Sequence, residues 1–481
     1  MSTDTLTSIA PAPGQVATTR SQARGHWLPL LVILAGTFMS VLDFFIVNVA
    51  LPSMQAGLHA SNGAIEWVVA GYGLTTAVFL ITGARIGDRW GRRRAFTIGL
   101  ALFTISSAAC GVTSSPTLLV VARLAQGTSA ALLAPNILAI IGAIYDGADR
   151  PRALAAYGMS MGLAAVSGQL IGGALVQANL FGLGWRMCFL INVPIGVLAV
   201  LAAPRLIPET RAPGRIGLDL PGTVLATLGL TAIVLPLVDG RAHGWPLWTW
   251  LLLAAAPFLL GAFAYRQRRL DAAGGAPLIP PMLFQARGFT VGLIAQTLFW
   301  CGQGSFFLVL SLYLQMGRGL SALHAGLVFT ILAITYVVAS MQAPALTERH
   351  GRRVLAAGAL VLAAGHLVLL LAVGDVGTGG SVWALVPGLM LVGAGMGLAI
   401  STVPSIVMAT MRPEHVGATS GVLSTMQFVG SAIGVAVIGI LFYGDLSHGF
   451  AAAFELSVGA LAVTLASVAV LARLLPATVR S

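Results

Sequence analysis

The sequence predicts an all-α polytopic membrane protein with fourteen transmembrane helices, and three observations lead to this prediction. Of the 481 residues, 57% are hydrophobic and only 9% are charged, whereas charged residues make up about 25% of an ordinary soluble domain. Apolar runs of roughly 20 residues, long enough to cross the hydrocarbon core, recur along the chain. All 26 basic residues are arginines, and nearly all of them lie between these runs.

The apolar runs form a first group of six, a pair, and a last group of six. Short loops around Ser114–Pro116 and Gly444–His448 separate two pairs of neighbouring runs. The expected spans lie near 28–50, 64–86, 95–113, 117–142, 153–178 and 187–203, then 219–238 and 247–265, then 289–314, 323–345, 354–374, 381–407, 417–442 and 450–474.

These groups divide the chain into five expected parts. Residues 1–26 are rich in Ser, Thr, Ala and Pro and are predicted to be a disordered cytoplasmic tail. An N-terminal six-helix bundle is expected over 27–204, a linker with two inserted helices over 205–270, and a C-terminal six-helix bundle over 271–475. A short cytoplasmic tail, 476–481, follows.

The placement of arginine predicts the orientation of the chain. With the N-terminus inside, 22 of the 26 arginines fall on the cytoplasmic side, whereas Arg186, Arg241 and Arg318 fall outside and Arg123 lies within a span. Cytoplasmic loops carry an excess of basic residues. We therefore expect both termini to be cytoplasmic. The exclusive use of arginine as the basic residue is typical of a GC-rich bacterial genome, so we expect the membrane to be a bacterial inner membrane.

Composition and motifs exclude several classes of enzyme. The absence of lysine excludes a Walker A loop, a Schiff-base lysine and a pyridoxal site. Cys110, Cys188 and Cys301 lie far apart in apolar runs, which excludes a disulfide framework or a zinc knuckle. Neither a His-Glu-x-x-His nor a Gly-x-Ser-x-Gly stretch occurs. We expect no enzyme activity, metal or cofactor; a membrane-embedded enzyme or sensor, the remote alternative, would need a catalytic cluster.

An internal repeat relates the two groups of six spans. The loop around Asp88 after the second span matches the loop around Glu348 after the tenth span, at an offset of 260 residues. The stretch Ser167–Gly172 matches Val429–Gly434 at an offset of 262. Two similar halves with a site between them are typical of transporters, because rocking one half against the other exposes that site alternately to each side.

Several segments carry a resemblance to a known family. They are Arg-Ile-Gly-Asp-Arg-Trp-Gly-Arg-Arg at 85–93, Leu-Asp-Phe-Phe-Ile-Val-Asn-Val-Ala-Leu-Pro at 42–52, Ala-Arg-Leu-Ala-Gln-Gly at 122–127, Gly-Trp-Arg at 184–186 and Asn-Val-Pro-Ile-Gly at 192–196. With fourteen spans, the chain resembles the 14-helix drug:proton antiporter branch of the major facilitator superfamily over nearly its whole length.

The resemblance implies the major facilitator fold and proton-coupled efflux of hydrophobic or amphipathic drugs or antibiotics. The expected partners are the small-molecule substrate, protons and the lipid bilayer; the scattering of the arginines between apolar runs argues against nucleic acid, and we expect a monomer. Dedicated export of a natural product or metabolite, or uptake by symport, remains open because cavity shape decides the substrate. Four positions depart from the family pattern: Phe45 replaces Thr, Ala84 replaces Gly, Gln169 replaces Pro, and Glu348 replaces Asp. Gln169 matters most, since a Pro there would bend the helix. The loss of this Pro weakens antiport as an inference from that stretch alone.

Charged residues inside the spans are the first candidates for the mechanism, because burying charge in a membrane is expensive. Asp43 and Arg123 are both expected in the outer half of the bilayer, where a proton on Asp43 and the substrate could compete for one state of the cavity. The alternative is a fixed structural pair. Glu66 is expected to be a solvated helix-end residue beside Trp67, or a second proton site if its helix begins earlier. Glu455 has the same ambiguity, and His366 is expected to be a packed residue.

Three further sets are predicted to serve the transport cycle. They are a cytoplasmic latch, a helix-sliding surface and a substrate cavity. For each set there is an alternative: the arginines of the latch only set topology, the glycines only allow close packing, and the cavity residues bond between helices or face lipid. The expected cytoplasmic latch comprises Asp88, Arg89, Gly91, Arg92, Glu348, Arg349 and Arg352; the helix-sliding surface comprises Gly158, Gly162, Gly168, Gly172 and Gly173; and the substrate cavity comprises Asn48, Gln126, Asn136, Gln169, Trp300, Gln303 and Phe306.

Overall fold

The computed structural model describes residues 27–145, 149–211, 219–400, 402–409 and 416–475, so the expected tails at 1–26 and 476–481 lie outside the described residues. The described part contains helices and no strand. Fourteen of its helical segments are long and apolar enough to cross a membrane. The predicted all-α architecture and the number of spans are therefore confirmed.

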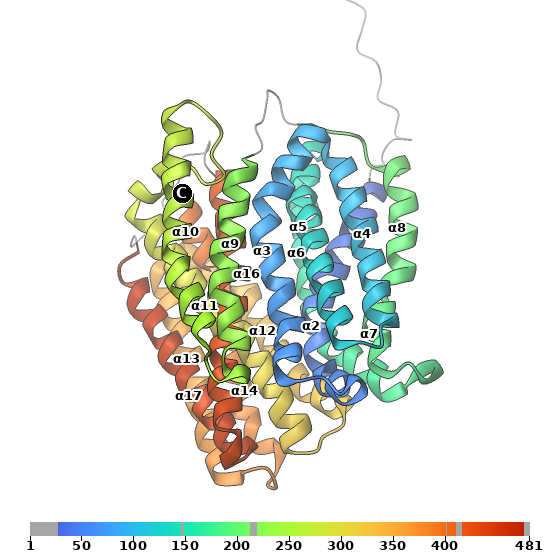
Figure 1. Ribbon diagram of the computed structural model, residues 1–481, viewed down its shortest axis with the longest axis vertical. Helices are drawn as coiled ribbons and strands as arrows, with labels where there is room; N and C mark the ends of the chain where they lie inside the picture. The colour runs from blue at the N-terminus through green and yellow to red at the C-terminus, as the bar shows by residue number, and fades with distance from the viewer. Residues whose placement is uncertain (1–26, 146–148, 212–218, 401, 410–415, 476–481) are drawn as a thin grey trace, which may run out of the picture.

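The spans follow one another in the predicted order (Figure 1). The first six are α2 (Leu28–Leu58), α3 (Asn62–Trp90), α4 (Arg92–Val112), α5 (Pro116–Ile144), α6 (Asp149–Ala178) and α7 (Met187–Leu190) joined to α8 (Asn192–Leu206); the inserted pair is α9 (Leu220–Asp239) and α10 (Leu247–Ala272); the last six are α11 (Arg287–Leu312), α12 (Ala322–His350), α13 (Arg352–Val376), α14 (Val386–Ile400) with α15 (Thr402–Ala409), α16 (Val416–Gly444) and α17 (Phe450–Ala472).

Local sequence signals set several of the helix ends. Ser61 and Ser321 precede α3 and α12, and each serine hydroxyl accepts a hydrogen bond from a first-turn backbone N–H, which satisfies a donor that the helix itself cannot pair. Gly91 and Gly351 end the same two helices with φ of 120° and 53°, a region that favours glycine. These matching ends lie 260 residues apart, as the repeat predicts.

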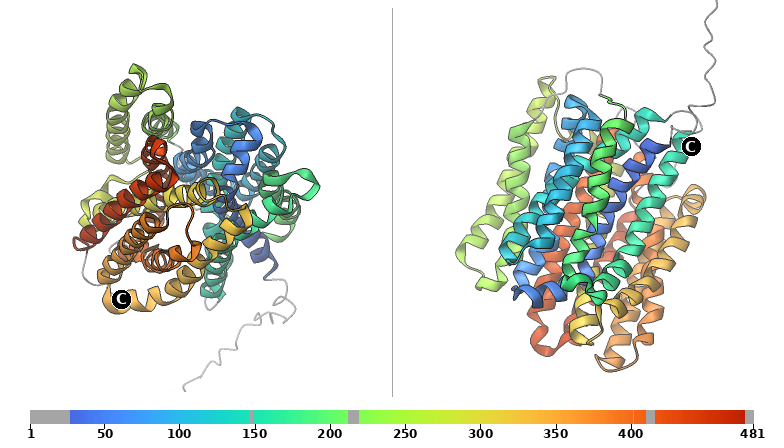
Figure 2. Two further views of the ribbon diagram at one scale, coloured as in Figure 1. Left: turned by 90° about the horizontal axis from the view of Figure 1, so that it is seen from below. Right: turned by 90° about the vertical axis from the view of Figure 1, so that its right-hand side faces the viewer.

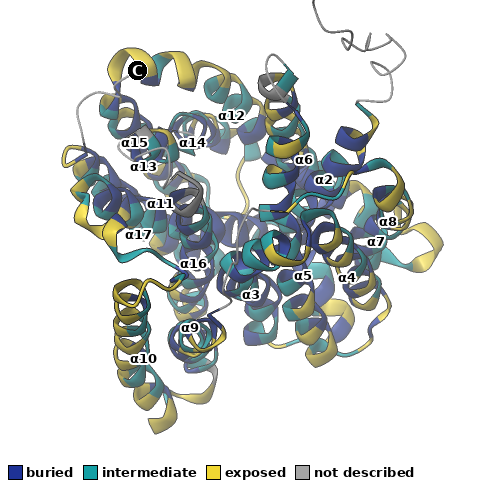
Figure 3. Ribbon diagram, turned by 90° about the horizontal axis from the view of Figure 1, so that it is seen from above, coloured by how far each residue is buried: buried dark blue, intermediate teal, exposed yellow. Residues whose placement is uncertain are grey.

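The same packing pattern occurs twice along the chain. In the N-half, which we define as α2–α8, α5 packs on α3 and α4, α6 on α2, and α8 on α4. In the C-half, α11–α17, α14 packs on α12 and α13, α16 on α11, and α17 on α13. The halves meet along two seams, α3 on α16 and α6 on α12 (Figure 3). The residue limits of the expected domains stay a prediction.

The inserted pair lies outside the two halves, where Figure 2 shows it as a separate green hairpin in the view from below. Its first helix, α9, packs on both α3 and α16, while α10 packs on α9. A hydrogen bond of 2.9 Å between the hydroxyls of Thr82 and Thr223 joins α9 to α3. The inserted pair therefore covers the seam between α3 and α16.

The two ends of the bundle differ. We call the end where α3 turns into α4 and α12 into α13 the arginine-rich end; it lies uppermost in Figure 1. Towards the opposite end, Ser311 donates a 2.7 Å hydrogen bond to the backbone oxygen of Asn48, and Gln315 donates one of 2.8 Å to that of Val49. The backbones of α6 and α12 also approach closely there, at Gly173 and Ala322. These contacts tie the halves together towards the opposite end.

Candidate functional site

A buried ion pair occupies the interior of the N-half. A guanidinium nitrogen of Arg123, on α5, lies 2.5 Å from Oδ2 of Asp43, on α2. The two side chains are 1% and 0% exposed. The sequence placed both residues at one level of the bilayer, and the structure brings them into direct contact.

Neighbouring helices hold both charges in place. Gln126 accepts from Arg123 at 2.8 Å and donates to Oδ1 of Asp43 at 2.9 Å. The Nε of Arg123 donates to the backbone oxygen of Val68 at 2.9 Å, and its guanidinium lies 4.4 Å from the ring centre of Tyr72. All of these contacts are made within the N-half, so the pair is a preorganised unit of that half.

Asn192 completes the carboxylate environment, and the sequence analysis did not single it out as a site residue. Its amide donates to Oδ1 of Asp43 at 3.2 Å and to the hydroxyl of Ser107 at 3.1 Å. Asn192 begins α8 within the Asn-Val-Pro stretch that contributed to the family resemblance. That polar residue at the start of an apolar span was the available signal.

Glu66 is not a solvated helix-end residue, so the favoured expectation for it was wrong. Its side chain is 1% exposed, and its Oε1 lies 3.4 Å from a guanidinium nitrogen of Arg241. The helix α3 begins at Asn62, two residues earlier than expected. The loop of the inserted pair, which supplies Arg241, covers Glu66 on one side. On the other side α16 lies close, because a Cβ added to Gly439 would be 2.7 Å from the carboxylate of Glu66.

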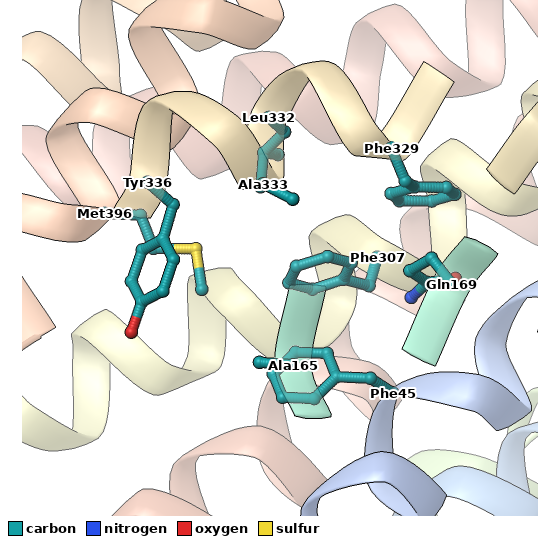
Figure 4. A pocket seen from close by; sticks show the side chains of 9 residues that line it. All are labelled: Phe45, Ala165, Gln169, Phe307, Phe329, Leu332, Ala333, Tyr336 and Met396. Carbon is teal, nitrogen blue, oxygen red and sulfur yellow. The ribbon is translucent and has the colours of Figure 1, made fainter. Parts of the chain in front are cut away.

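A narrow hollow lies between the halves, next to the seam of α6 and α12 (Figure 4). The side chains around it are uncharged and mostly aromatic or aliphatic. Nine residues line this hollow: Phe45 from α2, Ala165 and Gln169 from α6, Phe307 from α11, Phe329, Leu332, Ala333 and Tyr336 from α12, and Met396 from α14.

The other predicted cavity residues lie in different surroundings. Gln126 belongs to the ion pair, and Asn136 donates to the backbone oxygen of Gly83, which joins α5 to α3. Asn48 donates to backbone oxygens of its own helix. Phe306 packs edge-on against His366 of α13, with ring centres 4.8 Å apart. Its neighbour Phe307 lines the hollow instead.

Two predicted cavity residues of α11 retain unpaired polar atoms. Both amide atoms of Gln303 and the indole N–H of Trp300 are buried without a protein hydrogen-bond partner among the described residues. Unpaired buried polar atoms are costly and uncommon. These residues are therefore candidates for contact with a bound molecule.

The predicted latch forms its contacts within each half. Asp88 pairs with Arg92 at 2.8 Å, and Glu209, after α8, accepts from the backbone N–H of Arg93 at 3.1 Å. Glu209 therefore satisfies a backbone donor in the first turn of α4. Gly91 turns the chain against Glu209. The remaining predicted latch residues differ in their surroundings: Arg352 donates to the backbone oxygens of Arg473 and Leu475, whereas Arg89, Glu348 and Arg349 are exposed.

The predicted sliding glycines of α6 fall into two groups. Gly168 and Gly172 pack against α2, and Gly173 packs against the backbone of α12. An added Cβ on Gly158 or Gly162 would meet nothing within 4 Å. Of these five glycines, only the three towards the opposite end therefore lie at close helix contacts.

A second polar cluster fastens the inserted pair at the arginine-rich end. Asp219 caps α9, and its carboxylate accepts from Arg266 at 2.7 Å, from Gln267 at 2.7 Å and from the N–H of Gly222 at 2.9 Å. Burial raises the pKa of Asp219, but the hydrogen bonds from Gln267, Arg266 and Gly222 outweigh it, so that the pKa lies below its ordinary value. The cluster is a structural anchor of the hairpin.

Two similar halves of apolar helices, a buried ion pair in one half and a hollow between the halves define a polytopic membrane transporter. The family model of the Major Facilitator Superfamily matches residues 33–435 and 292–481. The chain belongs to this superfamily.

Curated relatives match nearly the whole chain. It is 39% identical over 442 residues to the probable actinorhodin transporter of Streptomyces coelicolor, covering 92% of this chain and 76% of that one. It is 34% identical over 479 residues to the puromycin resistance protein pur8 of Streptomyces alboniger, covering 95% and 93%.

Solved structures share the fold at low sequence identity. A peptide transporter POT in complex with sulfate gives a TM-score of 0.66 at 18% identity, covering 93% of this chain and 95% of that one. A D-xylose-proton symporter gives a TM-score of 0.66 at 13% identity, covering 93% and 97%.

Proposed function

We propose that this protein is a monomeric, proton-coupled efflux transporter that exports antibiotics or related amphipathic drugs across the bacterial cytoplasmic membrane. The observation that carries the proposal is the direct, fully buried contact between Asp43 and Arg123. The proton gradient, and no bound cofactor, would supply the energy. Both chain termini and the arginine-rich end would face the cytoplasm, as the positive-inside rule requires.

The relatives support export of antibiotics. Three relatives are named as a probable actinorhodin transporter, a puromycin resistance protein and a cephamycin export protein. Because these names each refer to one compound, they also favour the second candidate, a dedicated exporter of a single natural product.

In the proposed cycle, Asp43 carries the proton. Protonation removes the negative charge that Arg123, Gln126 and Asn192 now contact. Arg123 would then reorganise within the N-half, and this change would bias the rocking of one half against the other. Since a ligand or proton shifts such an equilibrium only by its differential interaction with the two states, the buried ion pair is the element able to couple them.

The arrangement supports assignment to an inward-facing state. The halves are hydrogen-bonded towards the opposite end, through Ser311 and Gln315. At the arginine-rich end, Asp88 pairs with Arg92 of its own half. The family resemblance implies that the latch engages in the outward-facing state, so its contacts to the C-half would form when the halves rock.

The experiment uses proteoliposomes that contain a pH-sensitive dye. After a proton gradient is imposed, puromycin, a cephamycin and lipophilic dyes are added to wild type, Asp43→Asn and the exposed-site control Asp149→Asn. We expect substrate-dependent proton movement in wild type and Asp149→Asn and its loss in Asp43→Asn.

Movement that survives in Asp43→Asn would transfer the proton role to Glu66, Glu455 or His366. If none of the compounds moves protons, proton-coupled export of this class of compound is refuted.

A further inference from the structure

We propose that the hollow recognises an uncharged, planar aromatic compound with a hydrogen-bond donor and acceptor side by side on one edge, and that Gln169 is its specificity-determining residue. This inference rests on the proposed function only in taking the hollow as the place where the exported compound binds. It names the chemical class of that compound.

Aromatic side chains from both halves form the walls of the hollow. The ring of Phe307 meets that of Phe45 edge-on at 5.3 Å and lies nearly parallel to that of Phe329, with centres 5.7 Å apart and planes inclined by 17°. Tyr336 and Met396 extend this wall. Edge-to-face and offset-parallel arrangements are those in which aromatic rings attract one another. A flat aromatic ligand can take part in the same arrangement, and it would contact the N-half and the C-half at once.

Gln169 provides the polar contact at the hollow. Its side chain is 3% exposed, and neither its amide oxygen nor its amide nitrogen has a protein hydrogen-bond partner among the described residues. Figure 4 shows this amide beside Phe307, among the aromatic side chains. Burying an amide without hydrogen-bond partners is unfavourable relative to leaving it in water. A ligand edge that donates and accepts would satisfy both atoms together.

The position of Gln169 in the sequence strengthens this assignment. The helix α6 presents the amide of Gln169 immediately after Gly168, which packs on Phe45 and Ile46. The close approach of α6 and α2 at Gly168 fixes the amide relative to Phe45.

The absence of charge around the hollow sets the charge of the ligand. All nine lining side chains are uncharged. Asp43 lies two residues before Phe45, but its carboxylate is fully buried against Arg123, Gln126 and Asn192. A cation in the hollow would therefore lie in apolar surroundings without a counter-charge, which is unfavourable. An uncharged ligand avoids this cost.

A second row of polar groups extends the site along α11. Trp300 and Gln303 precede Phe307 by seven and four residues, and residues at these spacings share a helix face. Their unpaired indole N–H and amide atoms therefore lie on the side of α11 that carries Phe307. A ligand of several fused rings could reach from Gln169 towards these groups.

The test measures binding of four probes to the full-length protein in lipid nanodiscs, with empty nanodiscs subtracted. Anthracene-2-carboxamide is flat and has the required donor and acceptor; 2-methylanthracene lacks them; adamantane-1-carboxamide has them without a flat ring; and ethidium is flat but cationic. We expect the first probe to bind at least about tenfold more tightly than each of the others. The reason differs between them: 2-methylanthracene loses one or two hydrogen bonds, adamantane-1-carboxamide loses the aromatic contacts, and ethidium brings a charge without a counter-charge.

Substitutions at two glutamines of α6 assign the effect. Gln169→Leu should weaken binding of anthracene-2-carboxamide about tenfold, to the level of 2-methylanthracene, whereas Gln177→Leu, at an exposed position, should leave all affinities unchanged. Phe307→Leu, a second variant, should weaken both anthracene probes and leave the ratio of their affinities near that of wild type.

Equal binding of the four probes, or equal effects of Gln169→Leu and Gln177→Leu, would overturn the proposed recognition site. The proteoliposome experiment separates this failure from that of the proposed function. Proton movement that depends on Asp43, without the expected probe selectivity, refutes the recognition site alone. The expected selectivity without proton movement upholds the recognition site and refutes proton coupling.

Discussion

Replacing Asp43 by asparagine tests the ion pair most directly, because asparagine keeps the shape of the side chain and removes its charge. Oδ2 of Asp43 accepts from Arg123, and Oδ1 accepts from Gln126 and Asn192. The amide nitrogen of asparagine donates. Whichever position it takes, at least one buried donor would face another donor.

The expected cost follows from this geometry. Removing one partner of a buried ion pair typically costs about 3–5 kcal/mol, because the other charge is left buried. Arg123 is 1% exposed, but asparagine still offers it one acceptor, so we expect the low end, about 3 kcal/mol. Asp149, whose pair with Arg152 is exposed, provides the control, and Asp149→Asn should cost less than about 1 kcal/mol.

Equilibrium unfolding in mixed detergent, followed by tryptophan fluorescence, measures these differences. The double variant Asp43→Asn/Arg123→Gln should be more stable than Arg123→Gln alone, since it leaves no unpaired buried charge. Two results would show that the buried charges are not coupled: Asp43→Asn lowers the unfolding free energy no more than Asp149→Asn, or the double variant is no more stable than Arg123→Gln alone. The argument that Asp43 carries the proton would then lose its basis.

Two further predictions concern the loop and the anchor at the arginine-rich end. Gly91→Ala places a Cβ 2.5 Å from a carboxylate oxygen of Glu209 at a φ of 120° and should lower the unfolding free energy by about 1–3 kcal/mol. The control Gly158→Ala, whose Cβ would meet nothing within 4 Å, should raise the unfolding free energy slightly. Equal effects of the two substitutions would contradict a strained turn at Gly91. Because the pKa of Asp219 is lowered in the folded protein, its contribution to stability is complete above the ordinary pKa of about 3.9 and is lost as the pH falls through the lower folded-state value. The difference in unfolding midpoint between wild type and Asp219→Asn should therefore shrink between pH 5 and pH 3. In an Arg266→Gln background the difference should be smaller but should persist, because Gln267 and Gly222 still donate to the carboxylate; a difference that stays constant from pH 5 to pH 3 would contradict the argument.

The sequence was sufficient to predict the helices, because each span needs a long apolar run and arginine marks the loops. It did not predict helix ends well. The helix α2 continues through Pro52 to Leu58, beyond the expected end at residue 50, since apolarity fixes where a helix crosses the membrane and not where it stops. Likewise, α3 begins early enough to bury Glu66.

The contact between Asp43 and Arg123 was foreseen only as a shared depth in the bilayer. Depth follows from counting residues along each helix, whereas the rotation of a helix about its axis depends on packing between distant segments. This explains why Phe307 and not Phe306 lines the hollow. It also explains why no local sequence pattern predicted the ion pair between Glu66 and Arg241, which lie 175 residues apart in the sequence.

The covering of one seam by α9 makes the transporter asymmetric towards the lipid. The α3–α16 seam is closed from outside by the inserted hairpin, whereas α6 and α12 lie at the rim of the molecule in Figure 3 with no helix drawn beyond them. The hollow borders this second seam, with Gln169 on one side and Phe329 and Ala333 on the other. The hollow therefore borders the seam that the inserted hairpin leaves uncovered, and the two added helices make the two flanks of the molecule unequal towards the lipid.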